Sequence, residues 1–367
     1  MKHRVVDLLQ CPCGSNGLVL RDAVVHDAPF RGSFDTLRCE NTCAFKQRVL
    51  SEPGDLTPRD CLACYGQEIT EGALDCGSCG RTWPIVGGLP RFLPDALADD
   101  IKKAQDTFSY EWKMFRFGER NWGQDIEHRK GLFLDALGTS PDDLRGKLIF
   151  DAGCGSGALA IEMAKSFEME VIALDLAYGV ENAYKHNDSP FVHFMQGSVL
   201  EPPLRSHVFD YLYCAGVLVH IPDTFSGFQA TIRTLKSGGR CFIWVYHPIT
   251  VQNYGGARRK LAVYNWLRVN VTSRLPIRAQ HALYLSAMPL FLIKQSIELQ
   301  LGRRRTRLTW REKMQALFDF FSPKYQHRYE PAEVWAWYEA TGFDNVAVSN
   351  VGTEGFGVRG DRAAVNS

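Results

Sequence analysis

The chain has 367 residues, of which 45% are hydrophobic and 23% charged, so it is long enough for two domains or for one domain with appendages. Its formal net charge is +1, which gives the molecule as a whole no strong attraction for polyanions. The N-terminus has no apolar run of the kind found in signal peptides, and the longest apolar stretch, residues 282–293, is too short to span a bilayer. We therefore expect a cytoplasmic protein.

The cysteines are concentrated near the N-terminus, where eight of the eleven fall within the first 79 residues. The eight form four close pairs, Cys11/Cys13, Cys39/Cys43, Cys61/Cys64 and Cys76/Cys79. Paired cysteines in a chain without an export signal favour metal over disulfides. The last two pairs are identical Cys-x2-Cys hooks and predict a zinc site, whereas the first two are less regular and predict a second, diverged site. Four thiolates leave no open coordination position, so both sites are expected to be structural.

The rest of the chain divides by pattern. Residues 1–95 form the cysteine-rich region, residues 96–140 are expected to be a helical cap or linker, and residues 141–367 alternate between strand-like and helix-like segments. The alternation predicts a doubly wound, Rossmann-like α/β fold with helices on both faces of the sheet. Seven strands are expected, at residues 148–150, 170–175, 191–199, 209–217, 241–246, 343–349 and 355–360. The regularity breaks at about 250–325, which predicts a helical insertion before the last two strands.

A glycine-rich loop, Asp151-Ala-Gly-Cys-Gly-Ser-Gly157, joins the first strand to the first helix. Glycines permit a tight turn and a close ligand approach, and the helix start offers N–H groups to a carboxylate such as that of S-adenosylmethionine. Asp175 ends the second strand, where a carboxylate can accept hydrogen bonds from both ribose hydroxyls. Because Gly155-x-Gly157-x-x-Ala160 also matches the dinucleotide fingerprint, the layout alone leaves NAD open.

Three features favour the methyl donor over NAD. Asp151 precedes the glycines, where it can reach the cofactor's ammonium, Asp210 begins the fourth strand after a phenylalanine, and Leu235-Lys-Ser-Gly-Gly-Arg240 precedes the fifth. In content and order these segments resemble the class I S-adenosylmethionine-dependent methyltransferase family. The resemblance covers residues 105–360 as a pattern, and its specific motifs lie between residues 147 and 246.

The resemblance implies a set of cofactor-binding residues. This set is Asp151, Gly153, Cys154, Gly155, Gly157, Asp175, Leu176, Ser198 and Cys214. Within it, the loop residues would lie against the amino-acid end of the donor, Leu176 beside adenine and Cys214 beneath the sulfonium. Many family members carry an Asp at the position of Ser198, so a weaker or water-mediated contact with the adenine amine is expected.

The candidate general base is His220, in the segment Leu218-Val-His-Ile-Pro-Asp223 at the carboxyl edge of the sheet. Family members often carry histidine at this place, but the side chain could also simply pack near the pocket. Asp223 either orients His220 or caps the helix that follows, and we favour the cap. No Asn-Pro-Pro-Tyr or Asp-Pro-Pro-Tyr run follows the fourth strand, which argues against methylation of a nucleobase or a glutamine.

Two segments outside the sheet are expected to matter for the acceptor or for partners. In similar methyltransferases an aromatic helix covers the donor, and Tyr110 and Trp112 are the candidates here, with plain helix packing as the alternative. Residues 74–93 resemble a short zinc-ribbon family that is fused to methyltransferases or activates them as a small subunit, since they carry its Cys-Gly-Arg, aromatic-Pro-Ile and Gly-Leu-Pro-Arg-Phe-Leu features.

The insertion is strongly basic. Between residues 254 and 313 there are thirteen lysines and arginines and two acids, which gives this segment a charge of +11. It could form a peripheral membrane contact with anionic lipid or a lipid-linked substrate, hold RNA phosphates through Arg303-Arg-Arg305, or pack a homo-oligomer with its arginines in solvent.

These observations predict a methyltransferase (EC 2.1.1.-) that uses S-adenosylmethionine, with structural zinc, on a small-molecule or lipid-linked acceptor. An rRNA or tRNA methyltransferase that binds RNA through the ribbons and the insertion is the first alternative. A non-catalytic scaffold with a residual cofactor fold is the second. The sequence leaves open the identity of the acceptor, the methylated atom and the oligomeric state.

Overall fold

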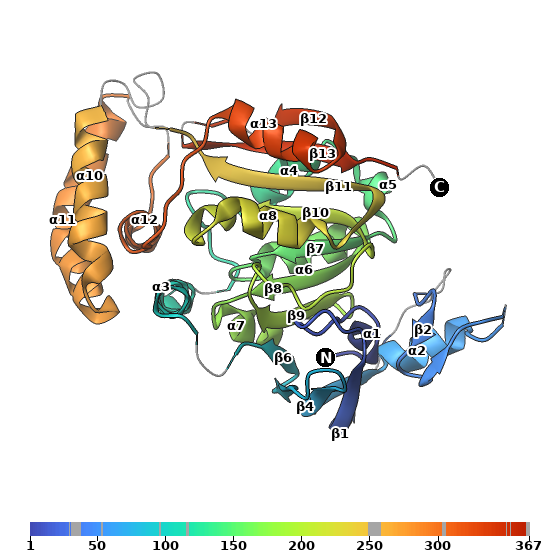
Figure 1. The fold of residues 1–367 in the computed structure, drawn as a ribbon. Helices are drawn as coiled ribbons and strands as arrows, with labels where there is room; N and C mark the ends of the chain where they lie inside the picture. The colour runs from blue at the N-terminus through green and yellow to red at the C-terminus, as the bar shows by residue number, and fades with distance from the viewer. Residues whose placement is uncertain are drawn as a thin grey trace.

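The computed structural model describes residues 1–28, 30, 38–52, 54–94, 97–114, 117–248, 258–302, 306–349, 351–352 and 354–364. Seven strands form the core of its sheet: β7 (Leu148–Ala152), β8 (Glu170–Asp175), β9 (Val192–Gly197), β10 (Phe209–Ala215), β11 (Leu235–Tyr246), β12 (Phe343–Ser349) and β13 (Gly355–Arg362). They lie in the order β9-β8-β7-β10-β11-β13-β12, and only β13 runs antiparallel to its neighbours (Figure 1). The predicted doubly wound fold is confirmed.

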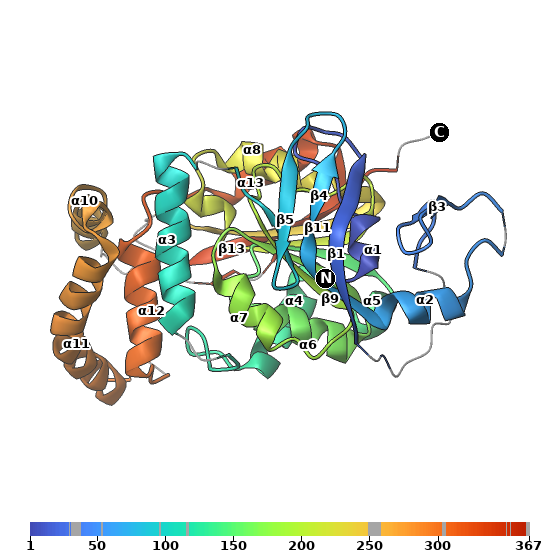
Figure 2. The same cartoon turned by 90° about the horizontal axis from the view of Figure 1, so that it is seen from below.

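Helices cover both faces of this core. On one face lie α4 (Ile126–Leu137), α5 (Pro141–Leu144), α6 (Ala158–Phe167) and α7 (Gly179–Lys185), and on the other α8 (Thr224–Ile232) and α13 (Pro331–Ala340). Figure 2 shows α6 and α7 on the opposite side of the sheet from α8 and α13. The central strand β7 is buried along its whole length, which explains its continuous apolar sequence.

The N-terminal region adds four further strands to the same sheet. These are β1 (Leu18–Asp27), β4 (Gln67–Cys76), β5 (Thr82–Val86) and β6 (Leu89–Phe92), which form an antiparallel meander. β6 then pairs in parallel with β9, through Arg91 opposite Gln196 and Phe92 opposite Gly197, so the sheet has eleven strands. The cysteine-rich region is therefore continuous with the core sheet.

A smaller unit lies between β1 and β4 in the chain. It contains β2 (Thr42–Cys43), β3 (Arg48–Val49) and α2 (Pro58–Tyr65), and it packs beside the N-terminal α1 (His3–Val6). The helix α2 begins at a capping box in which Thr57 and Asp60 satisfy each other's backbone N–H groups. This unit lies in the connection between β1 and β4, which pair with each other.

The remaining helices stand at one side of the molecule. They are α3 (Asp99–Met114), α10 (Arg258–Asn270), α11 (Ile277–Gln300) and α12 (Trp310–Phe321), with the short 3-10 turn η2 (Thr272–Arg274) after α10. A second 3-10 turn, η1 (Leu218–His220), lies after β10 and contacts α8 and β11. The helices α3 and α12 lie between the α10–α11 pair and the sheet (Figures 1 and 2). The predicted helical insertion is thus observed, although the predicted Arg303-Arg-Arg305 cluster falls outside the described residues.

The expected helical cap or linker of residues 96–140 contains two helices, α3 and α4, and Gly118 and Gly123 between them have positive φ angles. No helix among the described residues has the length and apolar content needed to cross a bilayer.

Candidate functional site

A cavity of about 610 Å³ opens at the carboxyl ends of β7, β8 and β10. This size lies within the range of about 300–1,000 Å³ that is usual for small-molecule sites. Seven of the predicted cofactor residues line it, namely Asp151, Gly153, Cys154, Gly155, Asp175, Leu176 and Ser198. We call this part the donor end. The opposite part, the acceptor end, is lined by Phe108, Glu111, His220, Tyr246, Asp319 and Tyr325.

The glycine loop has a backbone conformation that favours glycine, and an aromatic ring packs against it. Gly155 has a φ of 58°, and a Cβ on it would lie 2.5 Å from the indole of Trp112. The carboxylate of Asp175 accepts hydrogen bonds from the N–H groups of Gly155 (2.7 Å) and Ala177 (2.8 Å). The loop is therefore tied to the end of β8, with Trp112 above it, in the place where the sequence predicts the donor.

An acid and a guanidinium lie together at the donor end. Burial, reinforced by the charge of Asp175, raises the pKa of Asp151 to about 7, while the charge of Arg129 on α4 opposes this shift. Arg129 lines the same cavity, and burial lowers the pKa of its guanidinium. An amino-acid group offers an ammonium and a carboxylate, so this pair of side chains has the matching charges. Arg129 was not predicted, because it lies outside the motif-bearing segments.

Two residues of the predicted cofactor set lie away from the cavity wall. Cys214 is 1% exposed and belongs to the hydrophobic core, whereas its neighbours Tyr213 and Ala215 line the cavity. Alternate side chains of a strand point to opposite faces, which explains the one-residue error. Gly157 is the N-cap of α6, and a Cβ there would meet Ala183 rather than open space.

At the acceptor end, His220 lines the cavity, and only one of its two ring nitrogens is hydrogen-bonded. Its Nδ1 lies 2.9 Å from the carbonyl oxygen of Tyr325, which requires a proton on Nδ1, so Nε2 of the neutral ring carries the lone pair. Nε2 has no hydrogen-bond partner among the described residues and lies 3.7 Å from Oδ1 of Asp319. Burial lowers the pKa of His220 to about 4, so the ring is neutral at pH 7.

Two acids that the sequence analysis did not select line the same cavity as His220. Asp319 on α12 accepts a hydrogen bond from Oη of Tyr246 (3.3 Å), and burial raises its pKa to about 6. Glu111 on α3 is 1% exposed, and its Oε2 has no hydrogen-bond partner among the described residues. Burial, and then the charge of Asp319, raises the pKa of Glu111 well above its ordinary value.

Of the remaining predicted residues, one lines the cavity and two have other structural roles. Trp112 lines the cavity, but Tyr110 packs against the rings of His281 and Phe318, both with centroids 5.5 Å away, in the core of the insertion. Asp223 caps α8 by accepting hydrogen bonds from the backbone N–H groups of residues 225 and 226, so the preferred interpretation of this residue is confirmed.

The cysteines group differently from the predicted pairing. The four sulfurs of Cys11, Cys13, Cys76 and Cys79 lie within 4.8 Å of one another. Cys11 Sγ is 3.7 Å from Cys79 Sγ, and Cys13 Sγ is 3.6 Å from Cys76 Sγ. The predicted union of Cys61 and Cys64 with Cys76 and Cys79 is therefore wrong. The antiparallel pairing of β1 with β4 places Leu18 opposite Cys76. The first cysteine pair, which precedes β1, is thereby brought close to the last pair at the end of β4.

The middle two pairs form a separate buried cluster. Cys39, Cys43, Cys61 and Cys64 share it with apolar side chains of the smaller unit between β1 and β4. Cys39 Sγ also lies 3.5 Å from Oδ2 of Asp7 and 3.8 Å from Nη1 of Arg4. The two cysteine groups are thus nested along the chain, with the middle pairs enclosed by the outer pairs.

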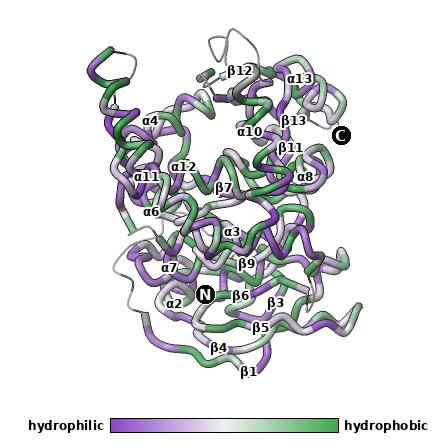
Figure 3. The backbone as a smooth tube through the Cα atoms, turned by 90° about the vertical axis from the view of Figure 1, so that its left-hand side faces the viewer, coloured by the Kyte–Doolittle hydropathy of each residue, from purple (hydrophilic) through white to green (hydrophobic). Residues whose placement is uncertain are grey.

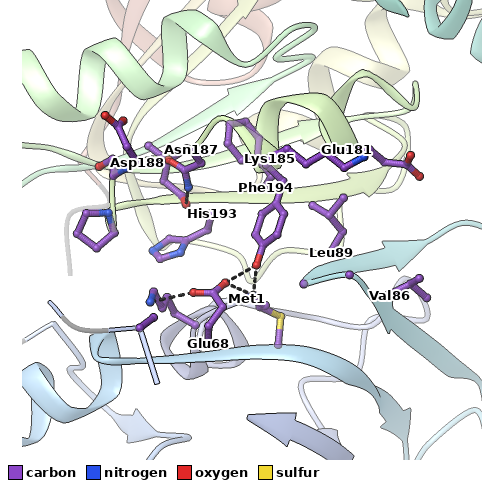
Figure 4. A pocket seen from close by; sticks show the side chains of 18 of the residues that line it. Met1, Glu68, Val86, Leu89, Glu181, Lys185, Asn187, Asp188, His193 and Phe194 are labelled. Carbon is purple, nitrogen blue, oxygen red and sulfur yellow. Dashed lines mark hydrogen bonds and ion pairs between the residues drawn. The ribbon is translucent and has the colours of Figure 1, made fainter. Parts of the chain in front are cut away.

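A second cavity, of about 910 Å³, lies between the N-terminal strands and the part of the core formed by α7 and β9 (Figure 4). Its charged groups are largely engaged with one another, since Glu68 contacts the ammonium of Met1, Nζ of Lys2 (2.8 Å) and Oη of Tyr184 (2.8 Å). Beside it, the buried Glu170 accepts from Tyr65 and lies 3.0 Å from Nε2 of His193. These contacts join the N-terminal region to β8, β9 and α7.

The strand order and the glycine loop define the core as a Rossmann-like α/β fold of the class I methyltransferase type. Residues 150–243 match the family model described as "Methyltransferase domain".

The chain is similar in sequence to several methyltransferases. A U6 snRNA methylphosphate capping enzyme of Drosophila melanogaster is 27% identical over 48% of the chain and 63% of its own length. A phosphoethanolamine N-methyltransferase of Triticum aestivum is 26% identical over 40% of the chain and 30% of its own length. The chain thus spans less than two thirds of these relatives. A magnesium protoporphyrin IX methyltransferase structure from Synechocystis, at 15% identity, covers 72% of the chain and has a TM-score of 0.42.

Proposed function

We propose that the protein is an S-adenosylmethionine-dependent methyltransferase that acts on a small-molecule or lipid-linked acceptor. The observation that carries this proposal is a single cavity in which the glycine loop, with Asp151 and Asp175, faces His220 and Asp319. The methyl donor and the acceptor would then bind side by side in the same cavity, which a direct methyl transfer requires.

Each end of the cavity has a distinct task in this proposal. Asp151 and Arg129 hold the ammonium and carboxylate of the donor, and Asp175 receives the ribose hydroxyls. When bound, the donor supplies a methyl group activated by its sulfonium. Nε2 of His220 receives a proton from the acceptor, and Asp319, 3.7 Å away, stabilises the imidazolium that forms. Trp112 covers the loop and excludes water from it.

The surface of the insertion supports a lipid-linked acceptor. Large apolar side chains on α10 and α11 are exposed, namely Val263 (55%), Trp266 (59%), Leu283 (44%), Leu290 (71%), Ile293 (58%), Ile297 (50%) and Leu301 (58%). Hydrophobic stretches are visible along these outer helices in Figure 3. An exposed apolar stripe on a segment of charge +11 has the composition of an interfacial, anionic-lipid-binding surface. The pair stands next to α12, which carries Asp319.

An RNA acceptor is the alternative that the basic insertion and the snRNA-modifying relative favour. Phosphate contacts make binding steeply dependent on salt. Electrophoretic shifts of structured RNA at low and high salt separate the two proposals, because binding that weakens steeply with salt supports RNA and no binding at low salt removes it. A non-catalytic scaffold is disfavoured by the intact loop and by Asp175.

The donor is tested by calorimetry with S-adenosylmethionine, its demethylated product S-adenosylhomocysteine and NAD. The proposal expects saturable binding of the first two and no binding of NAD. Binding of NAD alone would overturn it, and no binding of any of the three would revive the scaffold interpretation.

We also propose that the cysteine groups hold structural zinc. A tetrahedral ZnS4 site with Zn–S bonds of about 2.3 Å has S···S edges of about 3.8 Å. The two shortest separations among Cys11, Cys13, Cys76 and Cys79 are 3.6 and 3.7 Å, so this outer group fits zinc closely. The middle group also gathers four cysteines in one buried cluster, although among the described residues only the outer sulfurs all lie within 4.8 Å of one another; a second zinc there is the further part of this proposal.

Elemental analysis of purified protein tests both zinc sites. Two equivalents per chain are expected, with one lost in Cys13→Ser and the other in Cys61→Ser. The control is Cys241→Ser, a buried cysteine of the core sheet. One equivalent in the wild type, lost in Cys13→Ser and kept in Cys61→Ser, would contradict the second site, and a metal-free wild type would contradict both.

A further inference from the structure

We infer that the acceptor presents a protonated amine to the acceptor end of the cavity, where the carboxylates of Asp319 and Glu111 and Nε2 of His220 receive it. The inference rests on the proposed function and adds to it the chemical class of the reacting group. It is carried by the charges that line the cavity and by the polar atoms there that have no partner.

The cavity wall is acidic. Its described lining contains six carboxylates and one guanidinium, from Asp100, Glu111, Asp151, Asp175, Asp319, Glu354 and Arg129. Asp151, Asp175 and Arg129 belong to the donor end. Asp100 accepts a hydrogen bond from Oη of Tyr325 (2.7 Å) and lies 3.6 Å from Nζ of Lys324. Glu354 has an interaction of its own, which leaves Glu111 and Asp319 for the acceptor. No lysine or further arginine of the described lining faces these two acids, and the nearby cations, Arg268 and Arg328, act on His220 from outside the lining. A phosphate or carboxylate at this place would be repelled.

Two polar atoms of the cavity lining, Nε2 of His220 and Oε2 of Glu111, have no hydrogen-bond partner among the described residues, and the buried amide of Gln315 lies next to Glu111. Because Nδ1 of His220 is engaged by the carbonyl of Tyr325, its Nε2 offers only a lone pair. Oδ1 of Asp319 lies 3.7 Å from that lone pair, while Oδ2 takes the hydroxyl of Tyr246. Oε2 of Glu111, on a side chain that is 1% exposed, has no hydrogen-bond partner among the described residues.

These groups call for a ligand that brings donors and positive charge. Buried acceptors without partners cost free energy, and adjacent carboxylates repel each other until a cation separates them. A primary ammonium supplies three N–H donors and one positive charge. A hydroxyl supplies one donor and no charge, and an ether or carbonyl supplies no donor. The ammonium is thus the group that matches the acceptor end in both respects.

The same groups complete the reaction. The ammonium first gives one proton to Nε2 of His220 or to the carboxylate of Asp319, which leaves a lone pair on nitrogen. The nitrogen then attacks the methyl carbon of the donor, so that an N–C bond forms and the C–S bond breaks with its electron pair staying on sulfur. The products are a methylated ammonium and a neutral thioether, and the base then releases its proton to water.

Three probes of one shape test the inference, because they differ only in the terminal group. They are 2-phenylethylamine, 2-phenylethanol and phenylacetate, each titrated by calorimetry into the full-length protein saturated with S-adenosylhomocysteine. The wild type is expected to bind the amine about tenfold or more tightly than the alcohol, and the carboxylate least. The preference should fall to about twofold or less in Asp319→Asn, which keeps the shape and removes the charge, and in Glu111→Gln, which keeps the shape and removes the carboxyl group.

The control variant is Asp106→Asn, an acid of the same helix α3 that is half exposed and paired with Lys102 at 2.7 Å. It should keep the wild-type preference. Affinity for S-adenosylhomocysteine and the thermal midpoint verify that each variant is folded. The inference is overturned if the amine fails to bind, if the three probes bind alike, or if the preference survives both substitutions. Loss of S-adenosylhomocysteine binding by the wild type would instead contradict the proposed function itself.

Discussion

The donor end and the acceptor end of the cavity are built from different kinds of structure. The donor end comes from one continuous loop between β7 and α6 and from Asp175 at the end of the next strand. The acceptor end collects side chains from α3, η1, β11, α12 and the segment after α12, with Phe108 and Tyr325 at its extremes in the chain. The donor end is therefore fixed by backbone geometry, and the acceptor end by how helices outside the sheet pack together.

This difference separates what is constant in such a protein from what can vary. A ligand held by the backbone of a loop in the core sheet constrains the fold itself. A ligand held by side chains on peripheral helices can change with a few substitutions while the fold persists. The two ends also differ in charge: Asp151 is accompanied by Arg129, whereas Glu111 and Asp319 face each other. Substitutions at the two ends should accordingly have separable effects.

The largest effect is expected from Gly155→Ala at the donor end. Gly155 has a φ of 58°, and its new Cβ would lie 2.5 Å from the ring of Trp112, so the loop or the indole must move. We expect the affinity for S-adenosylhomocysteine to fall roughly 100-fold, measured by calorimetry.

The matched control for Gly155→Ala is Gly146→Ala. Gly146 has a φ of 71°, but a Cβ there would meet no atom within 4 Å, so the substitution brings backbone strain without the clash. Equal affinities of the two variants would show that the approach of Trp112 does not shape the donor end.

A smaller loss is expected from Arg129→Met, which removes the guanidinium beside Asp151. A hydrogen bond to a charged group contributes about 1.5–3 kcal/mol, which corresponds to roughly a 10- to 100-fold loss of affinity for S-adenosylhomocysteine. Affinity for 5′-methylthioadenosine, which lacks the amino-acid end, should change by about twofold or less. Equal losses for both ligands would place Arg129 elsewhere than at the carboxylate and would remove the charge contrast between the two ends.

The sequence predicted the donor end nearly completely, because its residues are consecutive or end a strand. Seven of the nine predicted cofactor residues line the cavity. The prediction located the strand that contains Cys214 but chose the wrong face of it. Which of the alternate side chains of a strand faces the cavity depends on the twist and packing of the sheet.

The cysteines illustrate a different limit. Their pairs were found from spacing, which is local, but the partner of each pair depends on the register between β1 and β4. A unit of its own is inserted between these two strands, so the nearest hook in sequence, Cys61/Cys64, is not the nearest in space to Cys76. Nothing in the spacing of the hooks encodes that insertion.

The acids of the acceptor end were missed for a third reason. Glu111 and Asp319 sit on helices where acids ordinarily face water. Glu111 is buried and Asp319 half-buried because α12 of the insertion packs on α3, a contact between segments far apart in the chain. Only the histidine at this end carried a local signal, since His220 follows a predicted strand.

The smallest expected effect is the pH dependence of amine binding, and it distinguishes the two ends without any change of fold. Burial raises the pKa of Asp319 to about 6, so the free carboxyl becomes neutral as pH falls through that value, while 2-phenylethylamine stays protonated. His220, with a pKa of about 4, remains neutral in this range. Amine affinity should therefore fall about three- to fivefold between pH 7.5 and 5.5.

Calorimetry at saturating S-adenosylhomocysteine measures this dependence, and saturation is needed because Asp151, with a pKa of about 7, titrates at the donor end in the same range. The bound ammonium favours the charged carboxylate, which moves the midpoint of the fall below the value for the free protein. Asp319→Asn should bind the amine weakly and show no fall over this interval. A fall of equal size in Asp319→Asn would assign the titration to another group, such as Glu111, and would separate charge recognition from the His220–Asp319 pair.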